Sequence, residues 1–359
     1  MNILVNLGAG WAINLDEWEK KYKEKQAFDK MPYGYCWVED KDIRVTYLSL
    51  NKTEKKMLLN IDILMKIYFY MIKMPFLSFK FDAIWTHNDR ETLFYGFLKT
   101  LPIFRKLPPI IGNIIWLTDK KINNKKLKKY GKYLNKISNI TVLSKAQIEI
   151  LERDFNINRS KINFVRYGLN EKIYSDKNEK SKPKAIADKK EYILMVGTDI
   201  DRDIQMFKQI TLNLKEENFI FASNNIEYLN DKYEKNVTTM KCNLKEMKWL
   251  YGNSKYIIMP LKENAHASGC TTLIEAGFQG KAIITNSIRG LEDYYLEGTT
   301  AEIVDKNDLG AFLEAMKKLE NKEYRNKIEL STYDFFMNKN DFTSKTYANE
   351  FLKLTKSVI

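Results

Sequence analysis

Cysteine, histidine and proline are scarce in this sequence, and their scarcity excludes several kinds of site. The 359 residues contain three cysteines, two histidines and seven prolines. Cys36, Cys242 and Cys270 are odd in number and lack the spacing of metal ligands, which argues against a disulfide framework and indicates a reducing compartment. His87 and His266 are too few and too isolated for a histidine-rich metal site.

Long apolar runs are also missing. A membrane-spanning helix needs roughly 18–20 uncharged residues. The closest approach, residues 57–81, is interrupted by Asp62, Lys66 and Lys73. The apolar start of the chain has no basic segment before it, so we interpret it as a first strand and not as a secretion signal. We therefore expect a cytoplasmic protein.

Excess positive charge is confined to the first half of the chain. Residues 1–170 hold 30 lysines and arginines against 17 aspartates and glutamates, whereas residues 171–359 hold 29 against 29. The densest run, Lys120–Lys136, has eight lysines in seventeen residues. Such a run favours peripheral contact with an anionic membrane. A plain solvated helix is the alternative, and a nucleic-acid contact is disfavoured because no recognisable binding module accompanies the run.

Short apolar runs alternate with helical patterns along the whole chain. Runs of β-branched and aliphatic residues are typical of parallel strands buried on both faces. The alternation predicts an α/β protein with doubly wound, Rossmann-like sheets. The longest expected helix is Thr53–Lys73, and the expected strands are 2–7, 44–50, 83–87, 110–116, 140–143, 163–166, 191–196, 219–222, 256–259, 282–285 and 301–304.

The length and a polar stretch predict two domains. Single cores stop growing at about 250–300 residues, and this chain has 359. Residues 171–190 have almost no apolar periodicity and are typical of a linker. We therefore expect an N-terminal domain over residues 1–170, a C-terminal domain over 191–340, and a last helix within 341–359.

The segment from residue 265 to residue 305 carries the strongest functional signal. A turn of small residues, Ser268–Thr272, opens an apolar helix, and Glu275 lies one turn inside that helix. Free N–H groups and hydroxyls at a helix start favour an anion. A carboxylate beside them accepts hydrogen bonds from a diol, and phosphate beside ribose describes a nucleotide.

This segment resembles the nucleotide-sugar signature of GT-B fold glycosyltransferases, especially the GT4-like (glycosyl transferases group 1) family. The matching motifs are Leu273–Ala276, Gly280–Ile284, Arg289–Gly290 and Asp293–Gly298. The resemblance implies two Rossmann-like domains facing across a cleft, the first for the acceptor and the second for the donor. It implies that the last helix crosses back to the first domain. It also implies that neither metal nor cofactor is needed beside a nucleoside-diphosphate sugar, most often a UDP-sugar.

Two loops of the second half carry the donor-site residues that the resemblance implies. The loop after the strand at 191–196 lacks the family's arginine directly after its glycine, and we interpret Arg202 as its replacement. A surface ion pair with neighbouring aspartates is the alternative for Arg202, and Cys270 is expected to pack and not to react. The expected donor-binding residues are Gly197, Thr198, Arg202, His266, Ser268, Gly269, Cys270, Thr271, Thr272 and Glu275.

The sequence matches only part of the motif that retaining enzymes of this family share. The family's retaining pattern has a first glutamate eight residues before the one that matches Glu275, and that position is Ala267 here. The resemblance nevertheless favours retention of the anomeric configuration. An inverting enzyme would need a base on the first domain, for which the candidates are Asp16, Asp89 and Glu91.

Two strand ends in the first half complete the expected site. Residues 81–88 are similar to a family strand whose final histidine faces the donor sugar, so His87 joins Arg202 and Glu275 as an expected catalytic residue. A structural histidine is the alternative. Gly8, Ala9 and Gly10 follow the first strand and are expected to form an acceptor-side loop, unless they make only a tight turn.

The expected activity is transfer of a hexosyl unit from a nucleoside-diphosphate sugar to a glycan or lipid-linked acceptor, in the synthesis of cell-surface polysaccharide or glycoconjugate. The expected place is the cytoplasm, with peripheral contact at the inner face of the plasma membrane. Two other readings stay open. One is an inactive GT-B subunit that partners another glycosyltransferase, and the other is a GT-B-fold UDP-sugar epimerase.

Overall fold

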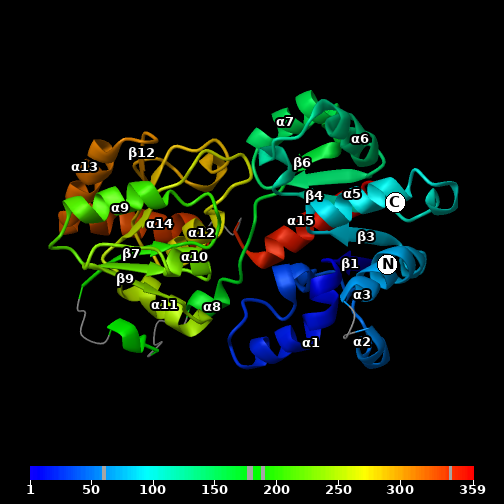
Figure 1. Cartoon of the computed structure of the whole chain (residues 1–359), viewed down its shortest axis with the longest axis horizontal. Helices are drawn as coiled ribbons and strands as arrows, with labels where there is room; N and C mark the ends of the chain where they lie inside the picture. The colour runs from blue at the N-terminus through cyan, green and yellow to red at the C-terminus, as the bar shows by residue number, and fades with distance from the viewer. Residues whose placement is uncertain (59–61, 176–180, 187–190, 339–341) are drawn as a thin grey trace. The chain divides into compact units, whose positions relative to one another are not determined.

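The computed structural model describes residues 1–58, 62–175, 181–186, 191–338 and 342–359. The chain divides into two compact units (Figure 1). Unit 1 consists of Met1–Glu24, Asp29–Arg166 and Ser344–Ile359, and unit 2 consists of Lys25–Phe28 and Tyr167–Thr343. Within the described residues, no helix combines the length and the apolar character that crossing a bilayer requires.

Unit 1 is built on a parallel sheet of six strands in the order β2-β1-β3-β4-β5-β6. The strands β3, β4 and β5 are buried along their whole length, which explains why most of their residues are apolar. Five of the six strands lie within two residues of the ranges that the sequence predicts, and β2 ends three residues early. The strands are β1 Asn2–Asn6, β2 Arg44–Tyr47, β3 Ala83–Thr86, β4 Ile110–Ile114, β5 Asn139–Val142 and β6 Ile162–Phe164.

The helices of unit 1 connect these strands. The described part of the helix expected over 53–73 is helical, as α2 (Lys52–Leu58) and α3 (Asp62–Tyr68), and it closes with a π-helical turn (Phe69–Lys73) that the sequence does not predict. Residues 59–61 of that prediction lie outside the described residues. The other helices include α1 Ala9–Lys23, α4 Met74–Ser78, α5 Asp89–Leu98, α6 Asn124–Leu134 and α7 Ala146–Phe155.

The last helix, α15 (Ser344–Lys356), belongs to unit 1. Its Phe351 ring packs against Trp85 of β3 at a centroid distance of 5.6 Å. The indole N–H of Trp85 donates to Thr355 Oγ1 at 2.7 Å. Figure 1 shows this helix, in red, beside the blue and cyan elements of unit 1. The chain therefore returns to its first unit at its end.

Unit 2 has a second parallel six-stranded sheet, in the order β12-β11-β10-β7-β8-β9. The sequence predicts five of its strands and misses β9, because V-T-T-M is a half-buried edge strand without a fully apolar run. The strands are β7 Ile193–Val196, β8 Phe219–Ala222, β9 Val237–Met240, β10 Ile257–Met259, β11 Ile283–Asn286 and β12 Glu302–Val304.

The helices of unit 2 include one inside the expected linker. α8 (Lys172–Ser175) follows the start of unit 2, and its Tyr174 is buried. Residues 176–180 and 187–190 of the expected linker lie outside the described residues. The other helices are α9 Ile204–Asn213, α10 Ile226–Leu229, α11 Leu244–Asn253, α12 Cys270–Phe278, α13 Leu309–Glu320 and α14 Lys322–Asn338.

Candidate active site

The strand order of unit 2 indicates the edge of the sheet at which a ligand binds. Counted in chain order, its strands are arranged 3-2-1-4-5-6, so the direction of winding reverses between β7 and β10. Open parallel sheets bind ligands at the carboxyl ends of the two strands that flank such a reversal. The loop after β7 and the loop before α12 leave these two ends. These two loops and helix α12 contain the donor-site residues that the sequence predicts.

The start of α12 offers backbone N–H groups. Gly269 precedes the helix with a φ of 93°, and a Cβ at this position would lie 2.7 Å from Met259 Sδ, so only glycine fits. In the described part of the chain, no side chain caps the first turn. Thr271 is exposed there, whereas Ser268, Cys270 and Thr272 are buried. The N–H of Cys270 already donates to the carbonyl of Ala267 at 3.0 Å, so the first turn offers an anion the N–H groups of Thr271 and Thr272 and one exposed hydroxyl.

Arg202 joins the loop after β7 to this helix start. Its side chain is only 3% exposed. Nη1 donates to Ser268 Oγ at 3.1 Å, and Nη2 donates to Thr272 Oγ1 at 3.3 Å. Burial lowers the pKa of Arg202, and the charge of Asp199 opposes this effect. The guanidinium thus lies against the start of α12, and not in the surface ion pair that was the alternative.

Gly197 and Cys270 have packing roles beside Arg202. A Cβ on Gly197 would lie 1.9 Å from Arg202 Nε, which donates to the carbonyl of Val196 at 2.9 Å. Gly197 therefore makes room for the guanidinium. Burial raises the pKa of the Cys270 thiol to about 12, so this thiol stays protonated and packs, as the sequence analysis expects. The neighbouring Thr198 is exposed, and its Oγ1 accepts from the N–H of Asn224.

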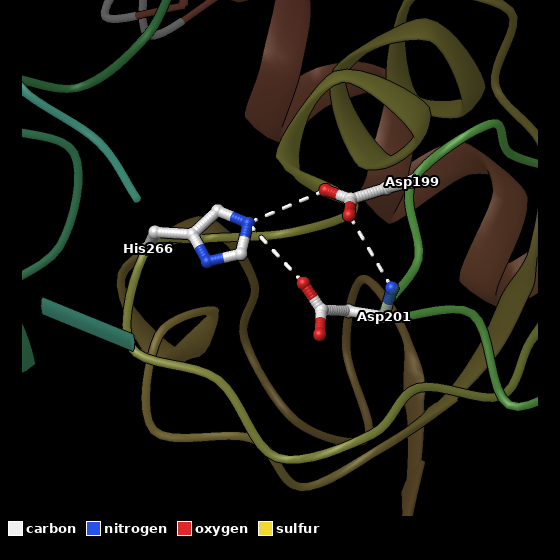
Figure 2. A group of neighbouring side chains, drawn as sticks. All are labelled: Asp199, Asp201 and His266. Carbon is white, nitrogen blue, oxygen red and sulfur yellow. Dashed lines mark hydrogen bonds and ion pairs between the residues drawn. The ribbon is translucent and has the colours of Figure 1, made fainter. Parts of the chain in front are cut away.

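A second cluster lies at the same strand ends (Figure 2). His266 Nε2 is 3.3 Å from Asp199 Oδ2 and 3.5 Å from Asp201 Oδ2. Although burial raises the pKa of Asp199, the hydrogen bond and charge of His266 hold it well below its usual range. Among the described residues, these three form the group whose metal-ligating atoms converge, all within 4.8 Å of one another. Their ligand types suit a divalent cation, and the same contacts suit an imidazolium held by two carboxylates.

Glu275 is held by two tyrosines that the sequence analysis did not identify. Tyr174 donates to Oε1 at 2.8 Å, and Tyr251 donates to Oε2 at 2.6 Å. The side chain is 9% exposed, so the carboxylate is nearly enclosed. Burial raises the pKa of Glu275, against the two hydrogen bonds and the charge of Arg202. Each carboxylate oxygen keeps one lone-pair site beyond its tyrosine.

The sheet of unit 1 reverses its winding between β1 and β3. Gly8, Ala9 and Gly10 leave the end of β1, and His87 leaves the end of β3, so the two predicted segments lie at neighbouring strand ends. Gly8 has a φ of 97°, and a Cβ there would lie 2.5 Å from Glu91 Oε1. Ala9 begins α1. A Cβ on Gly10 would meet nothing within 4 Å, so this position is open.

His87 is enclosed by aromatic rings. The Tyr33 ring stacks on its imidazole at a centroid distance of 3.5 Å, and Tyr35 Oη lies 2.9 Å from Nδ1. Its side chain is 3% exposed, and burial lowers its pKa to about 3, so the imidazole is neutral at physiological pH. The open surface at this strand end therefore belongs to Tyr33 and not to His87. Tyr33 itself has a φ of 62°, which is unusual for a non-glycine residue.

The three carboxylates considered as bases for inversion all have partners. Asp89 accepts the N–H groups of Ile115 and Trp116 at 2.8 and 3.1 Å. Glu91 accepts from Tyr70 and Arg90, and Asp16 lies 2.7 Å from Lys55. Asp89 and Glu91 are also buried. Both donors to Glu91 reach Oε1, and its buried Oε2 has no hydrogen-bond partner among the described residues, whereas Asp16 is an exposed surface carboxylate.

Comparison with solved structures identifies the fold of this chain. No protein-family model matches the sequence, and no curated protein is recognisably similar to it. The chain is similar in structure to Anabaena HepE in complex with UDP-glucose, with a TM-score of 0.70 at 11% identity over 99% of this chain and 100% of that one. A glycosyltransferase from Rickettsia africae gives a TM-score of 0.67 at 16% identity, over 99% and 98% of the two chains.

A third solved structure agrees with these two. Sucrose-phosphate synthase from Thermosynechococcus elongatus has a TM-score of 0.67 at 12% identity, and the match covers 99% of this chain and 98% of that chain. All three similarities extend over both six-stranded sheets and the returning C-terminal helix. The chain therefore has the fold of the GT-B glycosyltransferases.

Proposed function

We propose that this protein is a glycosyltransferase that moves a hexosyl unit from a nucleoside-diphosphate sugar, preferably a UDP-sugar, to a hydroxyl of a glycan or lipid-linked acceptor. The observation that carries the proposal is the position of Arg202 against Ser268 and Thr272, behind the uncapped start of α12. A buried guanidinium and a row of N–H dipoles together favour a diphosphate. The structural likeness to HepE with bound UDP-glucose supports the choice of donor.

The departing diphosphate accounts for most of the catalytic task. Its negative charge grows as the glycosidic bond breaks, and preorganised donors aimed at it lower the barrier most effectively in a site with little water. The N–H groups of the first turn of α12 and the exposed hydroxyl of Thr271 would contact the phosphates directly. Arg202 is fixed by its contacts with Val196, Ser268 and Thr272, so its charge needs no reorganisation during the reaction.

Glu275 would accept a hydroxyl of the ribose through the lone pairs that Tyr174 and Tyr251 leave. The two tyrosines hold both carboxylate oxygens, so the side chain has one orientation. Because their hydrogen bonds favour the charged form, they oppose the protonation that burial promotes. We propose this role in place of an exposed carboxylate, and we propose His87 as the support of the Tyr33 ring and not as a direct sugar contact.

We propose that transfer proceeds with retention of configuration. The support is the GT4-like motif around Glu275, together with the two backbone N–H groups that hold the carboxylate of Asp89 in unit 1. In this proposal the leaving phosphate accepts the proton of the attacking hydroxyl. The reaction would take place in the cytoplasm, where the three free cysteines stay reduced, at the inner face of a membrane that attracts basic unit 1.

Binding of nucleotide sugars tests the proposal directly. Isothermal titration with UDP-glucose, GDP-mannose and ADP-glucose would show which base is accepted, and binding of none of them would overturn the proposal. Thr271→Val removes one exposed hydroxyl without changing shape, and a hydrogen bond to a charged group is worth about 1.5–3 kcal/mol. We therefore expect roughly a tenfold to hundredfold loss of affinity. The matched control is Thr299→Val, an exposed threonine of the same unit outside the site.

A turnover assay distinguishes the three candidate functions, which are a transferase, an inactive subunit and an epimerase. Release of UDP from a bound UDP-sugar, with the sugar appearing on water or an acceptor, supports a transferase. Binding without any release would identify an inactive subunit. Interconversion of the UDP-sugar with a second UDP-sugar, in the absence of acceptor, would identify an epimerase.

A further inference from the structure

Unit 1 contains a groove that the proposed reaction does not use. It lies between α5 and α6 and has a volume of about 800 Å³. One wall comes from α5, with Arg90, Leu93, Phe94 and Phe97. The segment from 117 to 123 and one face of α6 complete it. Its volume lies in the upper part of the usual range for small-molecule sites, about 300–1,000 Å³.

The floor of the groove is apolar and largely aromatic. The Phe97 ring contacts Phe94 and Tyr133 at centroid distances of 6.0 and 5.5 Å, so three rings form a continuous row. All three are only partly buried. Gly96 brings the helices together behind them, since a Cβ there would lie 2.4 Å from the carbonyl oxygen of Tyr133. The floor is therefore a fixed surface that leaves apolar area open to a ligand.

Lysines form the rim on the α6 side. Lys121, Lys126 and Lys129 line the groove and are exposed. Within the described ranges none of these three is paired with a carboxylate. Lys129 lies above the Tyr133 ring at 5.8 Å. The groove's one acidic lining residue, Asp89, is 4.0 Å from Lys120 and accepts two backbone N–H groups, so its charge is compensated. The rim is thus strongly positive.

Only one face of α6 lines the groove. Lys126, Lys129, Tyr130 and Tyr133 follow the spacing of a single helix face, and all four line the groove. The remaining lysines of α6, at 125, 128 and 132, do not line the groove. The helix is therefore not a uniformly solvated basic segment, because aromatic and basic residues share one side of it.

An exposed apolar surface continues from the groove. Tyr70, in the π-helical turn, contacts the Phe94 ring at 5.4 Å. Beside it, Met71 and Ile72 are 58% and 52% exposed, which is high for side chains of this size. Phe76 of α4 is 52% exposed and contacts the Phe104 ring. Adjacent apolar and basic surfaces are typical of a protein that lies in a membrane interface.

We propose that the groove between α5 and α6 binds an anionic phospholipid of the membrane, with a hydrocarbon chain on the aromatic floor and the phosphate among Lys121, Lys126 and Lys129. The positive rim suits any anion, but the apolar floor suits only a ligand that also has a hydrocarbon part. A nucleic acid would leave the aromatic floor uncovered, so an anionic lipid fits the groove better. The proposal extends the membrane contact of the proposed function and gives that contact a specific place. It depends on unit 1 alone, so donor binding at α12 serves as an independent readout.

Sedimentation of the full chain with vesicles tests the proposal. Vesicles of phosphatidylcholine alone are compared with vesicles that also contain phosphatidylglycerol, and we expect binding to the second kind only. Lys126→Glu/Lys129→Glu reverses two charges of the rim. The matched control Lys125→Glu/Lys128→Glu makes the same change at two exposed lysines of α6 that do not line the groove. A lysine near an anionic surface contributes about 1 kcal/mol. The rim variant should therefore bind at least roughly tenfold more weakly than the control variant.

The floor is tested by Phe94→Ser, which should weaken vesicle binding while UDP-sugar affinity and the unfolding temperature of unit 2 stay unchanged. Equal losses in the two lysine variants would overturn the groove and indicate a general electrostatic attraction. Equal binding to both kinds of vesicle, or to neither, would overturn the anionic-lipid proposal. Competition by inorganic phosphate alone, with no effect of Phe94→Ser, would identify a simple phosphate site and also contradict it.

Discussion

Replacing His87 by asparagine should make unit 1 less sensitive to acid. His87 is stacked under Tyr33 and bonded to Tyr35, and burial lowers its pKa from 6.5 to about 3. In the unfolded chain the imidazole takes up a proton near pH 6.5, whereas in the folded protein it stays neutral. The unfolded state therefore binds more protons below pH 6.5, and unit 1 loses stability as the pH falls toward 3.

The size of this loss follows from the difference between the two pKa values. Each pH unit between them is worth about 1.4 kcal/mol. At pH 5 the neutral imidazole therefore costs about 2 kcal/mol relative to pH 7. Asparagine retains a hydrogen-bonding atom near the position of Nδ1 and has no titration. The variant loses the stacking at every pH, but it lacks the acid-dependent part of the cost.

Urea unfolding followed by tryptophan fluorescence measures the effect. Five of the six tryptophans lie in unit 1, so the signal reports mainly that unit. The stability gap between wild type and His87→Asn should close by about 2 kcal/mol between pH 7 and pH 5. His266→Asn, the matched change in unit 2, should leave this fluorescence transition unchanged. A gap for His87→Asn that is independent of pH would refute the enclosed, neutral imidazole.

Two further predictions concern unit 2. Gly197→Ala would place a Cβ 1.9 Å from Arg202 Nε; we expect a loss of about 1–3 kcal/mol in thermal unfolding of unit 2 and weaker UDP-sugar binding, whereas Gly10→Ala, at an open position, should change neither. Tyr251→Phe removes one donor to Glu275 and should cost about 1.5–3 kcal/mol at pH 7. That cost should shrink at lower pH, where the carboxylate of Glu275 becomes protonated. Urea unfolding measures the stability of the variant, and titration with UDP-glucose measures its affinity. If neither differs from wild type, the prediction is wrong.

Most of the strands were predictable because both of their faces are buried. β8 and β10 read as continuous apolar runs, and their burial in the structure is complete. β9 was missed for the opposite reason, since an edge strand is only half buried. The region from 53 to 73 has helical periodicity throughout, but the π-helical turn at Phe69–Lys73 depends on packing around Phe69 and is invisible in the pattern.

The candidate site was predictable in position and less so in detail. The order of the strands determines the edge of the sheet at which the loops 197–203 and 265–269 lie. The strands that precede these loops, β7 and β10, are predictable from the sequence. Their side-chain partners come from distant parts of the chain. Glu275 is bonded to Tyr174, which lies 101 residues away, and no local pattern marks that tyrosine.

The sequence by itself determined the α/β alternation, the two parallel sheets, the uncapped helix start before Glu275 and the concentration of positive charge before residue 170. These features are local or additive, so composition and spacing are enough to find them. Only the tertiary structure decided that Arg202 turns inward against α12, that Tyr33 covers His87, and that the lysines of α6 share a face with an aromatic groove. The physical reason is that burial and partner choice depend on which residues the fold brings together across long distances in the chain.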